Sequence, residues 1–382
     1  MVGRKRESHF GLEPDIRIDR ALEAKWWAAF MLQNFGGVER FRSLREEVEE
    51  QIYEVSRNFP KPKVHQVEQV TSAITPEQFH DRYYKTDTPV LIKGFYKDTK
   101  ACKTWTPQMF KEKYGHEIVP SRINATTTTD YSTADLTMAQ LVDDMMNDGE
   151  YHGTGFEDVL NHNPELRDDI DVPRLEEYAI PPSRRNTPLS RLMGRVFSTQ
   201  MFMAAPRATT GWHCAGPTNL FAMIYGKKHW SLVNPKYTPW MHTVVRKDRF
   251  YFLSLLDHRK TDEEVRAEGY RLYPHIPKCE VVVEEGDMLF VPSWWWHAVD
   301  NYGPTIAVAP RATGEPLRNN PLFTLMTMSD KSQWVGLSIV LRKQWPDDRF
   351  IGRSMKGWGL PSRVPVPGFR SKKPAAEQQA QL

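Results

Sequence analysis

Residues 209–235 of this 382-residue chain read TTGWHCAGPTNLFAMIYGKKHWSLVNP, and residues 286–299 read GDMLFVPSWWWHAV. Both stretches alternate short apolar and aromatic runs with Gly, Pro and Asn. The same pattern extends from Phe197 to about Arg311. Short strands separated by turn residues at regular intervals are typical of an antiparallel barrel or sandwich. We therefore predict a mainly β fold for this part of the chain.

Helical patterns flank the β-rich region. Apolar residues recur at helical spacing from Ile18 to about Val55, which predicts two N-terminal helices. Thr75 and Thr106 each precede a proline, an arrangement typical of a helix start. We also expect a buried strand at 89–94, helices at 136–146, 321–327 and 331–341, and loops with short turns at about 161–188.

The segment FPKPK at residues 59–63 suggests a boundary, because each proline removes a backbone donor and disfavours helix before it. The predicted organisation is an N-terminal helical region at 1–60, a barrel domain at 61–312, a C-terminal helical extension at 313–370 and a disordered tail at 371–382.

Composition excludes several classes of function. Lys and Arg together number 51 against 48 for Asp and Glu, a balance that argues against a dedicated binder of nucleic acid or membrane surfaces. The three cysteines, Cys102, Cys214 and Cys279, are widely spaced, so neither a disulfide framework nor a CxxC zinc site is expected. No run of 18 apolar residues occurs. We expect a cytoplasmic protein.

Within the two quoted stretches, the chain resembles the Jumonji-C or cupin oxygenases, and in particular small hydroxylases similar to the factor that inhibits hypoxia-inducible factor. The resemblance covers roughly residues 75–312 and implies a double-stranded β-helix that uses iron(II), 2-oxoglutarate and O2. It assigns the metal to His213 and His297. It assigns 2-oxoglutarate to Lys228 and, less directly, to Thr210, Asn219 and Tyr151.

The chain departs from the family pattern at Ala215, where the pattern requires an acidic iron ligand. Strand alternation sends His213 and Ala215 to one face and Cys214 to the other, so Cys214 is not a replacement ligand. Known 2-oxoglutarate halogenases resemble this variant: Ala or Gly replaces the acid, chloride or bromide binds iron there, and a ferryl intermediate removes the substrate hydrogen. We expect Ala215 and Gly216 to form such a halide pocket.

Two other functions stay open. The first is a hydroxylase with a non-standard third ligand, for which a carboxylate such as that of Asp300 is a candidate. The second is a catalytically inactive cupin that only binds, because loss of an anionic ligand weakens metal affinity.

The sequence says least about substrate and assembly. Trp296 and Arg311 are candidate substrate contacts. For Trp296 packing in the core is the favoured interpretation, and for Arg311 a surface ion pair is an equally good one. The expected substrate is a small molecule, an amino acid or a peptide. The apolar positions in the C-terminal helices suggest a homodimer.

Overall fold

The computed structural model describes residues 15–123, 132–179, 181, 198–244, 251–312 and 314–329. Strands in these ranges form two sheets. The six-stranded sheet consists of β1 (His65–Gln66), β8 (Thr209–Ala215), β10 (Lys227–Val233), β11 (Tyr251–Leu253), β12 (Cys279–Glu284) and β14 (Trp296–Asn301), in the order β1-β12-β10-β14-β8-β11. The larger sheet consists of β2 (Glu68–Thr71), β3 (Val90–Lys93), β4 (Ile118–Ile123), β5 (Ser132–Thr137), β6 (His152–Phe156), β7 (Ser198–Ala204), β9 (Thr218–Tyr225), β13 (Met288–Val291) and β15 (Thr305–Ala312).

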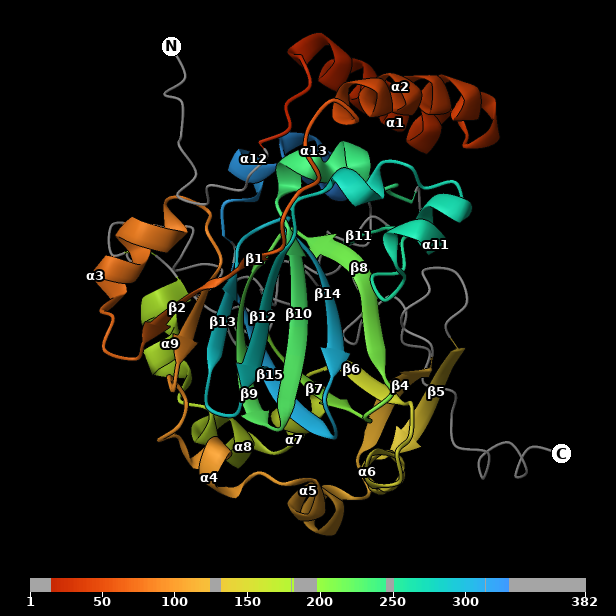
Figure 1. The fold of residues 1–382 in the computed structure, drawn as a ribbon. Helices are drawn as coiled ribbons and strands as arrows, with labels where there is room; N and C mark the ends of the chain where they lie inside the picture. Colours follow the sequence, from red (N-terminus) through yellow and green to blue (C-terminus); the bar gives the residue numbers. More distant parts are fainter. Residues whose placement is uncertain are drawn as a thin grey trace, which may run out of the picture.

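The larger sheet has nine strands in the order β2-β3-β13-β9-β15-β7-β6-β4-β5. Neighbouring strands in both sheets are antiparallel, except for the parallel pairs β1 with β12 and β2 with β3. The two sheets face each other as a jelly-roll barrel (Figure 1). The predicted double-stranded β-helix of the cupin type is thus confirmed.

Helices cover the barrel on its outside (Figure 1). Their bounds are α1 (Arg20–Gly36), α2 (Arg42–Ser56), α3 (Pro76–Phe79), α4 (Lys100–Thr104), α5 (Pro107–Tyr114), α6 (Met138–Met146), α7 (Asp158–His162), α8 (Pro164–Asp169), α9 (Val172–Ala179), α11 (Asp262–Ala267), α12 (Pro316–Asn319) and α13 (Pro321–Met328). Short helical turns lie at Glu39–Phe41, His80–Tyr84, Pro235–Trp240 and Tyr273–His275.

The two predicted helix starts, at Thr75 and Thr106, are confirmed. Thr75 caps α3 in a capping box with Gln78, and Thr106 accepts a hydrogen bond from the backbone N–H of Met109 at the start of α5. The helix expected at 136–146 begins two residues later, because Thr137, the last residue of β5, is its N-cap.

The interpretation of 161–188 as loops and turns is wrong over its first part, since α8 and α9 occupy 164–169 and 172–179. Pro164 stands at the first turn of α8, and the buried apolar side chains Leu166, Leu175 and Tyr178 attach the two helices to the barrel. The polar residues between these apolar positions make the helical spacing hard to detect in the sequence.

Two hydrophobic clusters hold the helices on the sheets. In the first cluster Trp26 and Phe30 of α1 join Phe252 of β11 and Phe323 of α13, and the Phe252 and Phe323 rings stack with centroids 3.7 Å apart. The second cluster packs helices α3 to α9 against the outer face of the nine-stranded sheet. Among the described helices, none is long and apolar enough to cross a membrane.

The predicted domain limits stay predictions. The helix expected at 331–341 and the tail at 371–382 lie outside the described residues, whereas the helix expected at 321–327 is confirmed as α13.

Candidate functional site

Two histidines meet inside the barrel. His213 on β8 and His297 on β14 are direct cross-strand partners, and their ring centroids lie 4.1 Å apart. Each ring uses Nδ1 to contact a backbone carbonyl two residues earlier, at 3.0 Å from Gly211 and 2.9 Å from Trp295. A carbonyl can only accept, so Nδ1 carries the proton and Nε2 keeps its lone pair on both rings. This is the arrangement that a pair of metal-binding imidazoles needs.

Burial keeps both imidazoles neutral. It lowers the pKa of His213 to about 4, and the positive charge of Arg311 acts in the same direction. Burial also holds the pKa of His297 well below its usual range, with a smaller effect from His213. A neutral imidazole is the form that binds a metal ion. The structure therefore brings together the two predicted metal ligands in the correct protonation state.

An irregularity in β8 places Thr210 on the same side as His213. The register between β14 and β8 shifts between His297 and Val299, so Val299 pairs with Thr210. On a regular strand, residues three apart would point to opposite faces. Instead the Thr210 hydroxyl lies 3.4 Å from Nδ1 of His152, a barrel-lining residue whose pKa is held well below its usual range by burial and then by the charge of Lys228. The predicted position of Thr210 beside the cosubstrate site is thus geometrically possible.

Lys228 lies inside the barrel with 3% of its surface exposed. Its ammonium donates a hydrogen bond to Oδ1 of Asn301, which also accepts one from the hydroxyl of Thr305 at 3.1 Å. Burial lowers the pKa of Lys228 to about 7, and the charge of Asp300 opposes this only in part. A buried amine without an ion-pair partner among the described residues is suited to bind a carboxylate.

The prediction for Tyr151 needs a correction. Tyr151 is half-buried and packs against the second cluster, on the outside of the nine-stranded sheet. Its neighbour His152 begins β6 and takes the inward position, with Thr210 as its partner and a buried Nε2 that has no hydrogen-bond partner. Strand alternation makes these two side chains point in opposite directions. His152 is the site residue that the sequence interpretation missed, by one position.

No described acidic residue replaces the missing iron ligand at Ala215. Among the described residues, no group of three His, Cys, Asp or Glu side chains can hold a metal ion. Asp300 is bonded instead to Nε2 of His258 at 2.9 Å, on the side of β14 that faces away from His297. Cys214 is fully buried in the first hydrophobic cluster, opposite His213, as expected. The proposal that Asp300 completes the iron site is therefore wrong.

Gly216 does not widen a pocket beside Ala215. A side chain built at Gly216 would meet the indole of Trp294 at 3.0 Å, so the ring already fills that space. Ala215 itself pairs with Tyr251 of β11, and its carbonyl accepts a hydrogen bond from the backbone N–H of Trp294 at 2.8 Å. Of the two residues predicted to form the halide pocket, only Ala215 remains a candidate.

Arg311 and Asn219 lie at the same level of the barrel, as cross-strand partners on β15 and β9. The guanidinium of Arg311 donates to Oε1 of Gln200 at 3.4 Å, and burial lowers its pKa to about 10. Oδ1 of Asn219 is buried and has no hydrogen-bond partner. The structure therefore places Arg311 inside the barrel near both histidines, and not in a surface ion pair.

The prediction that Trp296 contacts substrate is wrong. Its side chain has no exposed surface and points away from His297, where its indole N–H donates to the hydroxyl of Thr238 at 3.1 Å. Phe323 of α13 lies against it. Packing is the role of this side chain, since alternation along β14 turns position 296 outward when position 297 is inward.

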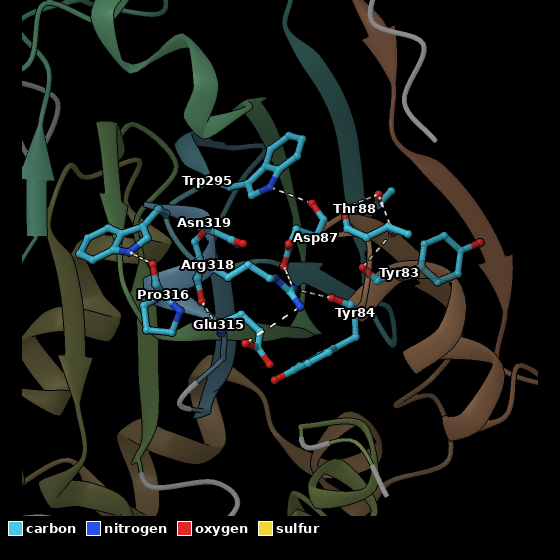
Figure 2. Close-up of polar contacts among 12 residues, drawn as sticks. Tyr83, Tyr84, Asp87, Thr88, Trp295, Glu315, Pro316, Arg318 and Asn319 are labelled. Atoms are coloured by element: carbon cyan, nitrogen blue, oxygen red, sulfur yellow. Dashed lines mark hydrogen bonds and ion pairs between the residues drawn. The ribbon is translucent and has the colours of Figure 1, made fainter. Parts of the chain in front are cut away.

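A polar network outside the barrel fixes the loop that leads into β14 (Figure 2). The indole N–H of Trp295 donates to the backbone carbonyl of Asp87 at 2.9 Å, and Arg318 of α12 forms an ion pair with the carboxylate of Asp87. Trp294, which adopts a left-handed backbone conformation with φ 64°, donates to the carbonyl of Pro316 at 3.1 Å. These contacts hold residues 294–296 immediately before the metal-site histidine.

The residues present fit an iron ion and 2-oxoglutarate in part. Two neutral imidazoles with adjacent rings keep their Nε2 lone pairs, and the buried, unpartnered Nε2 of His152 lies with Thr210 and Lys228 where an organic carboxylate could bind. The acidic protein ligand is absent. The donor set thus supplies two of the three protein ligands that this class of iron site uses.

Known proteins are similar in sequence to the barrel region of this chain. The family described as cupin-like domain matches residues 76–309. Lysine-specific demethylase JMJ21 from Arabidopsis thaliana is 26% identical over 231 residues, which cover 59% of this chain and 23% of that protein. JmjC domain-containing protein 8 from Rattus norvegicus is 23% identical, covering 60% of this chain and 76% of the relative. Lysine-specific demethylase 8 from Xenopus tropicalis is 20% identical, covering 58% and 47%.

The chain thus aligns with less than two thirds of the length of both demethylases. The matched residues include both histidines, Lys228 and the strands that carry them. The chain belongs to the cupin-like domain family.

Proposed function

We propose that this chain is an iron(II)- and 2-oxoglutarate-dependent halogenase, which replaces an aliphatic C–H bond by C–Cl or C–Br on a small molecule, amino acid or peptide. The observation that carries the proposal is Ala215. It follows His213 by two residues on the same face of β8, and no described carboxylate stands in for it.

The charge of the site supports an added anion. Both imidazoles are neutral, Ala215 carries no charge, and the guanidinium of Arg311 lies close enough to lower the pKa of both histidines. In a relative with an acidic ligand, that ligand would neutralise one charge of the metal. Here the same neutralisation requires an anion from solution, and chloride and bromide are small enough to fit beside a methyl group.

Several residues of the chain have assignable tasks. Lys228, Thr210 and His152 would hold the distal carboxylate of 2-oxoglutarate through a point charge and two neutral polar groups. Trp230 stacks on His297 with centroids 5.4 Å apart and fixes the ring orientation. Bound iron and cosubstrate would supply the oxidative chemistry that removes hydrogen from carbon, and the barrel walls would keep bulk water away.

Hydroxylation is the second candidate, because two relatives are named lysine-specific demethylases. On this view a water molecule or a substrate group takes the place of the acid, and the substrate is a protein or peptide. A cupin that binds without turnover remains the third candidate, since two protein ligands hold a metal less firmly than three.

The test is the visible charge-transfer absorption of the protein with iron(II) and 2-oxoglutarate under argon, recorded in sulfate, chloride and bromide buffers. A band that shifts with the halide supports halide on iron, and product mass spectra then report chlorine-for-hydrogen exchange. A band indifferent to halide refutes the halogenase and favours hydroxylation. No band at all leaves only the binding protein.

A further inference from the structure

We propose that Arg311 is the docking point for a carboxylate of the organic substrate, so that the substrate is an amino acid or a chain end with a free carboxylate. This inference rests on the proposed function only in requiring that the site accepts an organic substrate. The first step is the position of Arg311 along its strand. Ala307 and Ala309 share its inward face, and their small side chains lie beside it.

The second step separates Arg311 from the cosubstrate site. Thr305 at the other end of β15 bonds to Asn301, which holds Lys228. Arg311 lies six residues further along β15, about 20 Å at the rise of an extended strand. A distal carboxylate held by Lys228 would therefore lie toward the opposite end of β15 from Arg311, which leaves Arg311 available to a different anion.

The third step is that the positive charge of Arg311 has no counter-ion among the described residues. Among the described residues Arg311 has one polar partner, the amide of Gln200, and no ion pair. A partly buried guanidinium without a carboxylate partner is unfavourable, and a ligand anion removes part of that cost. The planar fork of arginine presents parallel N–H groups that match the two oxygens of a carboxylate better than a spherical halide. Oδ1 of Asn219, buried and unpaired across the strand, can accept an N–H beside that carboxylate.

The experiment measures binding by calorimetry to the full chain loaded with iron(II) and 2-oxoglutarate under argon. The probes are the N-acetyl amino acids, the free amino acids and the matching N-acetyl amino acid carboxamides, which lack the negative charge. We expect at least one acid to bind and its carboxamide to bind about tenfold more weakly or not at all. Free and N-acetylated acids distinguish an amino acid from a peptide end as the natural source.

The variants assign the effect to the side chain. Arg311→Gln should lose about tenfold or more in acid binding, and Arg311→Lys, which keeps the charge, should recover part of it. Arg207→Gln is the matched control, because its side chain is 64% exposed and lies outside the barrel. Affinity for 2-oxoglutarate should stay unchanged in all three variants.

Three results would overturn the inference: acids that bind no better than carboxamides, equal acid binding by Arg311→Gln and Arg207→Gln, or an equally large loss of 2-oxoglutarate affinity in Arg311→Gln. A wild-type absorption band that ignores halide would refute the halogenase and leave these binding results valid. The two proposals therefore fail independently.

Discussion

Replacing Lys228 by methionine should stabilise the metal-free protein while abolishing 2-oxoglutarate binding. Burial lowers the pKa of this lysine from 10.5 to about 7. Between these values the unfolded chain binds more protons than the folded one, so folded-state stability rises with pH through that window. At 1.36 kcal/mol per tenfold change in proton affinity, the buried amine costs about 4 kcal/mol at pH 7 and about 1 kcal/mol at pH 9.5.

Methionine removes that cost and keeps the length of the side chain, but it also loses the hydrogen bond to Asn301, which contributes about 1 kcal/mol. We therefore expect the free energy of unfolding to rise by about 3 kcal/mol at pH 7 and to change little at pH 9.5.

The assay is equilibrium denaturation at both pH values, with Lys227→Met as control. Lys227 is the exposed neighbour of Lys228, so its replacement should leave stability unchanged within about 0.5 kcal/mol at either pH. A loss of stability at pH 7, or an equal gain at both pH values, would refute the reasoning, because neither result is compatible with an uncompensated buried amine.

Three further substitutions test the site and its support. Ala215→Asp should raise iron(II) affinity by tenfold or more, measured by calorimetry, and should remove the halide dependence of the absorption band. The neutral Ala215→Asn should change neither the affinity nor the band. Arg318→Ala should lower the free energy of unfolding by about 1–3 kcal/mol, because the carboxylate of Asp87 loses an ion pair and the carbonyl of Tyr84 loses one hydrogen bond, and the exposed Leu317→Ala should not. Trp296→Phe should lower stability by about 1–3 kcal/mol yet leave 2-oxoglutarate affinity unchanged; a loss of binding without a loss of stability would contradict its assignment to packing.

The helix starts were predicted well from sequence because they depend on hydrogen bonds between residues that are close together in the chain. Thr75 and Thr106 cap their helices through hydrogen bonds to residues three positions away, and such signals need no tertiary structure. The histidine pair was predictable for a different reason, because each residue lies inside a recognisable motif. The strands that carry them were visible from turn residues at regular spacing.

The errors at the site come from contacts that local sequence does not encode. The sequence interpretation pointed Tyr151 into the barrel, whereas the structure points His152 there, because a shift of one residue along a strand reverses the face of every side chain. Gly216 is packed by Trp294, a residue 78 positions away in the chain, so its missing side chain leaves no space. Thr210 lies on the same face as His213 because of the irregularity of β8, which strand alternation alone does not predict.

The charges inside the barrel connect the two proposals. Lys228, which is buried, and Arg311, which is partly buried, form no ion pair with any described residue. Iron(II) would add two positive charges, and 2-oxoglutarate would cancel two of the resulting four. A poorly hydrated interior does not tolerate the remaining two. An anion at the Ala215 position would cancel one, and a substrate carboxylate on Arg311 would cancel the other. A neutral substrate would leave one buried charge uncompensated, so the loss of the acidic ligand and the presence of Arg311 together favour an anionic substrate.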